Sequence, residues 1–263
     1  MMRPEIVYEV PTWLSGSLIV IVTTLLSMLV QLLVHWLMPA RFRARHVSSV
    51  VAIFSVIGVT YAVLLAFVAM LTWEGFNKAR ADTFVEAGAV AELRRLTAGL
   101  AAAEAAPFQA AIDGYVHAVV QTEWPAQSQG RTDLSGEAWL LTMHGQLGRF
   151  VSSTPSDGAF AAQLLTQLGN LSTARQGRLS AVEPTVPAVV WAVILVGGGL
   201  MILFSAFLDA SSSVFHLLMT GALGASGALV IVLIVSLDSP FRSDFRISPA
   251  PFAMQATILD TPG

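Results

Sequence analysis

The feature that most constrains this chain is the segment from His46 to Trp73, which has no acidic or basic residue between His46 and Glu74. A residue in a helix rises about 1.5 Å, so this segment is long enough to cross a hydrocarbon layer of about 30 Å with some tilt. We therefore predict a membrane-spanning helix here, around which the other segments are arranged.

Small and hydroxyl side chains recur along one face of this segment, at spacings of three, four and seven residues. They are Ser48, Ala52, Ser55, Ala62, Ala66 and Ala69, with Gly58, Thr60 and Tyr61 beside them. Small residues let helix backbones approach closely, which favours packing between helices. Hydroxyl oxygens replace lost hydration, which favours the wall of an aqueous path. The sequence leaves both interpretations open.

Composition indicates a bilayer protein. Apolar residues make up 55% of the 263 residues and charged residues 12%, which is about half the share in a soluble globular protein. The lack of cysteine excludes disulfide bonds and thiolate chemistry. The net charge is −3 and no basic cluster is large enough to bind a nucleic-acid backbone, so we expect no nucleic-acid partner.

Three further apolar segments predict spans at about 14–38, 188–208 and 214–237, and the second span is predicted at 47–73. Only residues 209–213 separate the last two spans, so we expect an antiparallel hairpin. Its glycines favour close helix packing; they are Gly197, Gly198, Gly199, Gly221, Gly224 and Gly227.

Gln31 and His35 lie one turn apart in the first span. A polar pair inside a membrane is a candidate functional site, although His35 is close enough to the interface to be hydrated instead.

Residues 74–184 have the composition of a soluble helical domain, with three apolar stripes at helical spacing. The stripes are Phe108, Ile112, Tyr115 and Val119; Trp139, Met143, Leu147 and Phe150; and Phe160, Leu164, Leu168 and Leu171. Because no proline interrupts residues 47–106, the second span is expected to continue into this domain as one helix of about fifty residues. Residues 238–263, rich in proline and serine, predict an irregular tail against the domain or membrane surface.

The predicted fold is therefore all-α, with four transmembrane helices and a water-facing helical bundle inserted between the second and third. The domain organisation is residues 1–73, 74–184, 185–237 and 238–263. Arg41, Arg43 and Arg45 favour a cytoplasmic first loop, whereas the basic residues at 78, 80, 242 and 246 count for the opposite orientation. The sidedness stays open.

Nothing in the sequence indicates an enzyme. The five histidines are scattered, without metal-ligand spacing, and there is no phosphate-binding glycine loop, serine elbow or dinucleotide motif. We expect no catalytic residues, no metal site and no cofactor. A secondary transporter is also disfavoured, because the two span pairs show no repeat and no span carries a central charge.

The chain resembles the bestrophin-like family, a bacterial group defined as a domain of unknown function. The resemblance rests on residues 61–67 (YAVLLAF) running to Trp73 and Phe76, on residues 174–179 (ARQGRL), and on residues 237–241 (LDSPF). It implies an oligomeric ion channel in the bacterial inner (plasma) membrane, multi-pass, whose second span lines the pore. Bestrophins proper conduct anions, whereas the bestrophin-like group has been linked to potassium.

The residues favour a monovalent cation such as potassium, because the second span offers oxygens but no Lys or Arg, and Glu74 ends it. The pore-lining candidates are Ser48, Ala52, Ser55, Gly58, Thr60, Tyr61, Ala62 and Ala66. Glu74 is the candidate for the pore mouth. The candidates for a hydrophobic gate are Phe54, Leu64 and Phe67.

One copy with four spans cannot enclose a pore, so the expected partner is the chain itself, in a tetramer or pentamer. The lipid bilayer and permeant inorganic ions are the other expected partners. The alternatives are a chloride channel and a membrane scaffold or sensor that conducts nothing.

Overall fold

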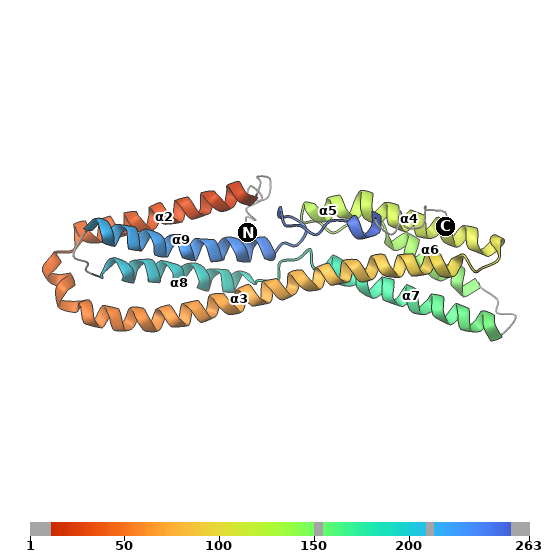
Figure 1. The fold of residues 1–263 in the computed structure, drawn as a ribbon, viewed down its shortest axis with the longest axis horizontal. Helices are drawn as coiled ribbons and strands as arrows, with labels where there is room; N and C mark the ends of the chain where they lie inside the picture. The colour runs from red at the N-terminus through yellow and green to blue at the C-terminus, as the bar shows by residue number, and fades with distance from the viewer. Residues whose placement is uncertain (1–11, 150–154, 209–212, 254–263) are drawn as a thin grey trace. The chain divides into compact units, whose positions relative to one another are not determined.

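The computed structural model describes residues 12–149, 155–208 and 213–253, and the described part of the chain is helical, without strands (Figure 1). The all-α prediction is confirmed. The elements are α2 (Thr12–Leu37), α3 (Ala40–Thr97), α4 (Ala102–Ala118), the π-helical turn η1 (Val119–Glu123), α5 (Trp124–Ser128), α6 (Glu137–Arg149), α7 (Pro155–Ser180), α8 (Ala188–Ala206) and α9 (Ser213–Leu237).

The chain forms two compact units. The membrane unit comprises residues 1–75 and 184–238, and the inserted unit comprises residues 76–183 and 239–263. Helix α3 has 58 residues and contributes to both. It starts at Ala40, so the backbone of the arginine-rich stretch 40–46 is the first part of this helix rather than a loop.

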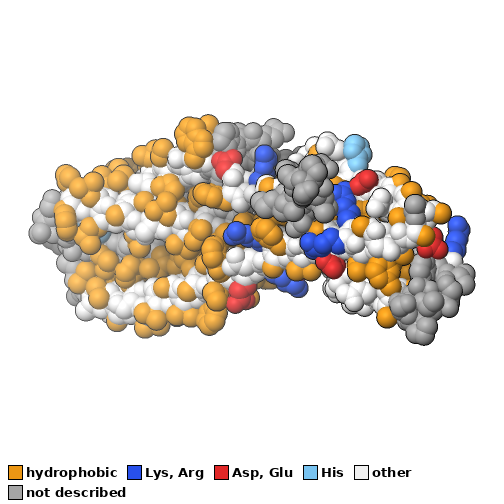
Figure 2. All heavy atoms as spheres, turned by 45° about the vertical axis from the view of Figure 1, so that its right-hand side comes forward, with side chains coloured by type: hydrophobic (Ala, Val, Ile, Leu, Met, Phe, Trp, Pro, Cys, Tyr) orange, Lys and Arg blue, Asp and Glu red, His pale blue; other side chains and the backbone are white. Residues whose placement is uncertain are grey.

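Among the described residues, four helices are long and apolar enough to cross a membrane, and they contain the segments Trp13–Leu37, Val47–Thr97, Ala188–Ala206 and Ser213–Leu237. At most 28% of the most apolar window in any of them is buried inside the chain. Hydrophobic side chains cover most of the visible face of these helices (Figure 2). Because exposed apolar surface on this scale needs an apolar solvent, these faces contact lipid or other copies of the chain.

Four of the six glycines predicted to favour close packing do lie against a neighbouring helix, whereas Gly199 and Gly227 have nothing within 4 Å of a Cβ position. A Cβ atom at Gly221 would lie 2.4 Å from the Met28 side chain, and one at Gly224 would lie 2.5 Å from Ser27 Oγ, so α9 contacts α2 closely at both glycines. Gly197 and Gly198 in α8 make room in the same way for the ring of Tyr61. Any larger residue at these positions would separate the helices.

The predicted pair Gln31 and His35 is part of a larger polar network. His216 donates from Nε2 to the Ser205 carbonyl (3.0 Å), so its Nδ1 accepts from the Gln31 amide (2.8 Å). Thr220 donates to Gln31 Oε1 (3.2 Å), and His35 lies 3.1 Å from the Gln31 amide nitrogen. Since Gln31 and His216 are both buried, they form a polar link between α2 and α9, while His35 at its edge is partly exposed.

The core of the inserted unit contains the side chains that the apolar stripes predict. Ile112, Tyr115, Met143, Leu164 and Leu168 are all at most 1% exposed. Trp139 is 39% exposed, and Phe150 lies outside the described residues.

Part of the segment 239–253 enters this core, while its residues 244–246 are exposed. Phe241 and Phe252 meet the ring of Trp124 edge-on, with centroids 5.7 and 5.9 Å away, and the Trp124 indole donates to the Ile247 carbonyl. All three residues of this segment are buried.

A cluster of buried charges lies in the same core. Arg178 donates to both oxygens of Glu86 (2.6 and 2.9 Å) and to Glu123 (2.7 Å), and all three side chains are fully buried. Arg175 bonds the other oxygen of Glu123 (2.5 Å) and the rim residue Glu137 (3.0 Å). Burial lowers the pKa of Arg178, but Glu86 more than reverses this, so the pKa is raised and the guanidinium stays charged.

Local structure explains how these charges meet. Arg175 and Arg178 are three residues apart on α7 and therefore lie on one face. The wide turn η1 ends at Glu123, which also accepts the Gly136 backbone N–H (2.8 Å). A Cβ atom at Gly177 would lie 2.2 Å from Asp82 Oδ2, so this glycine lets α7 approach α3.

Replacing Arg178 by methionine should destabilise the protein by about 3–5 kcal/mol, because Glu86 and Glu123 would remain buried without their shared partner. The matched control is Arg94→Gln, which breaks the exposed pair with Asp113 and should cost less than about 1 kcal/mol. Thermal unfolding of the purified protein in detergent measures both. Equal losses in the two variants would contradict the structural role of the buried cluster.

Candidate functional site

The segment of α3 inside the membrane unit has an inward and an outward face. Leu65, Val68 and Thr72 are buried against the rest of the unit. The members of the predicted ladder that are exposed are Ser48, Ala52, Ser55, Ala62 and Ala66. Ala62 also lines an apolar pocket with residues of α8 and α9, so it faces its own bundle. Large apolar side chains of the same segment are exposed as well, among them Val56 (69%), Val59 (66%) and Phe67 (66%).

Three other predicted pore-lining or gate residues lie on the inward side. The Tyr61 hydroxyl donates to the Ile194 carbonyl of α8 (3.1 Å). A Cβ atom at Gly58 would lie 3.3 Å from the Met201 side chain, and Leu64 is partly buried against the cluster around Leu65. These residues attach α3 to α8 and to the apolar interior of the unit.

The remaining candidates differ in exposure. Thr60 is exposed, Phe54 is partly buried, and Phe67 is 66% exposed. Of the three gate candidates, Phe67 is thus the one with most of its ring outside the chain. Glu74 is exposed at the end of the segment, as a residue at a pore mouth would be.

The hydroxyl groups of Ser55 and Thr60 on α3 have a defined orientation. Ser55 donates its proton to the Val51 carbonyl (2.8 Å), and Thr60 donates to the Val56 carbonyl (3.0 Å). Because each proton is used within the helix, the hydroxyl oxygen presents its lone pairs outward. A surface of such oxygens attracts cations rather than anions.

Near the end of α3's membrane segment, Asp238 joins α9 to the start of α8. Its carboxylate accepts the backbone N–H groups of Thr185 (2.8 Å) and Val186 (3.0 Å), immediately before the helix. Burial raises the pKa of Asp238 to about 6, although these two hydrogen bonds act in the opposite direction. The contact explains the aspartate of the LDSPF motif, which sequence reasoning quoted without a role.

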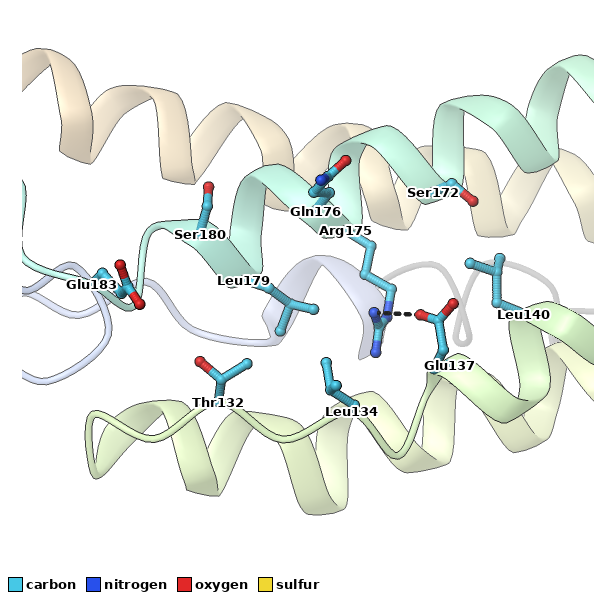
Figure 3. A pocket seen from close by; sticks show the side chains of 10 residues that line it. All are labelled: Thr132, Leu134, Glu137, Leu140, Ser172, Arg175, Gln176, Leu179, Ser180 and Glu183. Atoms are coloured by element: carbon cyan, nitrogen blue, oxygen red, sulfur yellow. Dashed lines mark hydrogen bonds and ion pairs between the residues drawn. The ribbon is translucent and has the colours of Figure 1, made fainter.

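The inserted unit has a polar pocket of 580 Å³ over its buried charges (Figure 3). Figure 3 shows Arg175 of α7 pointing across the pocket to Glu137 of α6, with Leu134 and Leu179 both on the side of its guanidinium away from Glu137. Glu183 also lines it. The described residues contain no group of three His, Cys, Asp or Glu side chains that would hold a metal ion. In this pocket Arg175 is already neutralised by Glu123 and Glu137, which favours a structural role.

Sequence reasoning missed Glu86 and Glu123 as partners of Arg175 and Arg178. The one available signal was the paired arginines in the ARQGRL segment, since two arginines on one helix face near apolar stripes need buried acids.

We expect the stability of the protein to depend on pH through the protonation of Asp238. A folded-state pKa of about 6 lies above the ordinary value of 3.8, so the folded protein binds this proton more tightly than the unfolded chain. The contribution of Asp238 to stability is therefore present at pH 5 and is lost as the pH rises to 7, by about 1 kcal/mol. Asp238→Asn removes the titration, so the melting temperature of the wild type relative to this variant should fall over that range.

The matched control is Asp113→Asn, a surface carboxylate 65% exposed. Its difference from the wild type should not change between pH 5 and pH 7. A flat difference for Asp238→Asn as well would show that Asp238 titrates below pH 5 in the folded protein.

Comparison with solved structures of other proteins supports the fold. One variant of a bacterial bestrophin homologue from Klebsiella pneumoniae is 14% identical, with 92% of this chain and 99% of that chain covered and a TM-score of 0.72. A second variant of the same homologue is 15% identical over 91% of this chain and 96% of that chain, with a TM-score of 0.68. At these identities the similarity establishes the fold alone. A comparison with curated proteins finds no match.

The sequence itself carries the family assignment. The family model described as "Bestrophin-like domain" matches residues 21–252, which include α3, the ARQGRL segment and the LDSPF segment. The chain is an integral membrane protein and belongs to the bestrophin-like family.

Proposed function

We propose that this protein is a homo-oligomeric ion channel whose pore is lined by the outward face of α3. The observation that carries the proposal is the exposure of Ser48, Ala52, Ser55 and Ala66 along α3. A purely lipid-facing surface has no need for hydroxyls at this regularity. Membership of the bestrophin-like family and the similarity to bestrophin homologue structures support the same proposal.

One chain presents one such face, so a closed lumen needs several copies around an axis. A tetramer or pentamer would bring the ladders together, with the exposed ring of Phe67 as the proposed hydrophobic gate. The proposed location is the bacterial inner membrane. We propose no enzymatic activity, and the function requires no cofactor.

We propose potassium or another monovalent cation as the permeant ion. The support is the outward oxygen lone pairs of Ser55 and Thr60, together with exposed Glu74 at the end of the segment. A chloride channel is the second candidate, because exposed Lys78 and Arg80 follow Glu74 within six residues of the same helix.

The direct test is the purified protein in planar bilayers with a gradient of potassium chloride, under which the potassium and chloride reversal potentials have opposite signs. A current whose reversal potential follows the potassium gradient supports the cation channel, and one that follows chloride supports the second candidate. If the protein is oligomeric but carries no current, a scaffold or sensor describes it better.

Ser55→Ala should lower the potassium-to-chloride permeability ratio severalfold, because it removes an oxygen from the lumen. The matched control is Thr72→Val on the same helix, whose hydroxyl is buried and bonds the Val68 carbonyl. The control should leave the ratio unchanged. If both variants keep the wild-type ratio, Ser55 does not line the selective part of the path.

A further inference from the structure

A second pocket, of 290 Å³, lies in the inserted unit between α3 and the chain that follows α9. Helix α3 contributes residues at four-residue spacing and therefore from one face. The lining residues from α3 are Phe76, Arg80 and Phe84, and those from the later segment are Phe245, Arg246, Ile247, Ser248, Ala250 and Pro251. The pocket combines two arginines with three phenylalanines.

Both arginines are available to a ligand. Arg80 and Arg246 are exposed, and neither forms an ion pair or a side-chain hydrogen bond with a described residue. The guanidinium carbon of Arg80 lies 5.9 Å from the ring centre of Phe84, which orients it without neutralising it. Two unpaired guanidinium groups beside one cavity suit a phosphate, which accepts paired N–H donors.

The phenylalanines indicate which phosphate compound fits. Phe245 is 72% exposed and Phe84 is 52% exposed. A site that binds only a free inorganic ion has no need for exposed aromatic rings beside it. Exposed aromatic rings beside basic side chains are typical of chain segments at a lipid headgroup layer. They would contact the apolar part of the same ligand whose phosphate binds the arginines.

The position along the chain agrees with this chemistry. Arg80 follows Trp73 by seven residues in the continuous helix α3, a rise of about 10 Å. Phe245 and Arg246 follow the last residue of α9, Leu237, by eight and nine residues. Both sides of the pocket therefore come directly after membrane segments, where lipid phosphates are concentrated.

We infer that this pocket binds the headgroup phosphate of an anionic phospholipid, with Arg80 and Arg246 on the phosphate and Phe84 and Phe245 against the glycerol and first methylenes. Lys78 adds a further exposed positive charge to the same stretch of α3. Asp244 is an exposed acid next to Phe245, and the balance of these charges stays positive.

The test uses the full-length protein in detergent, titrated with phosphatidylglycerol, phosphatidylcholine or inorganic phosphate, with bound lipid counted by native mass spectrometry. Phosphatidylglycerol should bind in preference to phosphatidylcholine, and inorganic phosphate should not compete at the same concentration. Arg80→Gln and Arg246→Gln should each weaken phosphatidylglycerol binding about five- to tenfold. Phe245→Ala should weaken it without changing the preference for the anionic lipid.

The matched control is Lys78→Gln, which removes the same charge from the same helix but from outside the pocket. It should weaken binding less than twofold. If all three charge changes weaken binding equally, the lipid is held by general surface charge and not by the pocket. If inorganic phosphate competes, the pocket binds a soluble anion and not a lipid headgroup. If Arg80→Gln instead dissociates the oligomer without changing lipid binding, the surface is an interface between copies.

Discussion

The inserted unit depends on one fully buried cation. Arg178 bonds acids 92 and 55 residues away in the sequence, on α3 and at the end of η1, and the carboxylate of Glu123 is shared with Arg175. Two buried arginines face two buried glutamates, so the charges cancel inside the core, while Glu137 completes the set at the rim. Such a cluster adds little net stability over an apolar core, but it strongly disfavours any arrangement of the helices that separates the partners. It therefore fixes how α7 and η1 pack on α3.

The membrane unit satisfies its polar groups differently, with neutral side chains. Gln31, His216 and Thr220 bond one another, and Tyr61 bonds a carbonyl of α8, so the inward polar atoms find partners within the chain. Among the hydroxyls that remain outside are those of the α3 segment, whose protons are also used within the helix, as is that of Ser226 on α9. In hydrocarbon, groups with unused acceptors have no partner, whereas in a water-filled lumen they do. This difference makes the outward face of α3 the best candidate for a path, and it assigns Tyr61 to the scaffold that holds it.

Sequence reasoning predicted the features that depend on local periodicity. It did not predict contacts between residues that are far apart in the sequence. The long apolar helices, the contacts of Gly221 and Gly224 in α9 and the buried stripe through Ile112 follow from spacing alone, because residues on one face of a helix recur at regular intervals in the sequence. The partner of Gln31 lies 185 residues away at His216, and no local pattern identifies it. The same holds for Glu86 and Arg178, and for Phe241 and Phe252, which leave an apparently irregular tail to enter the core. For the ladder, spacing identified the face, but only the structure separated Ser55, which points outward, from Tyr61, which points inward.

The proposed ion preference and the proposed lipid site bear on each other through charge. Glu74 and Arg80 are six residues apart on α3, and the arginine taken alone would oppose the attraction of cations by the glutamate. A phosphate held by Arg80 and Arg246 reduces that opposition, because one anionic headgroup neutralises one guanidinium charge at close range. Glu74 and the hydroxyl oxygens of Ser55 and Thr60 then dominate the local potential. The proposed channel can therefore favour cations even though arginines lie near the proposed pore mouth at Glu74, provided that an anionic lipid occupies the pocket beside α3.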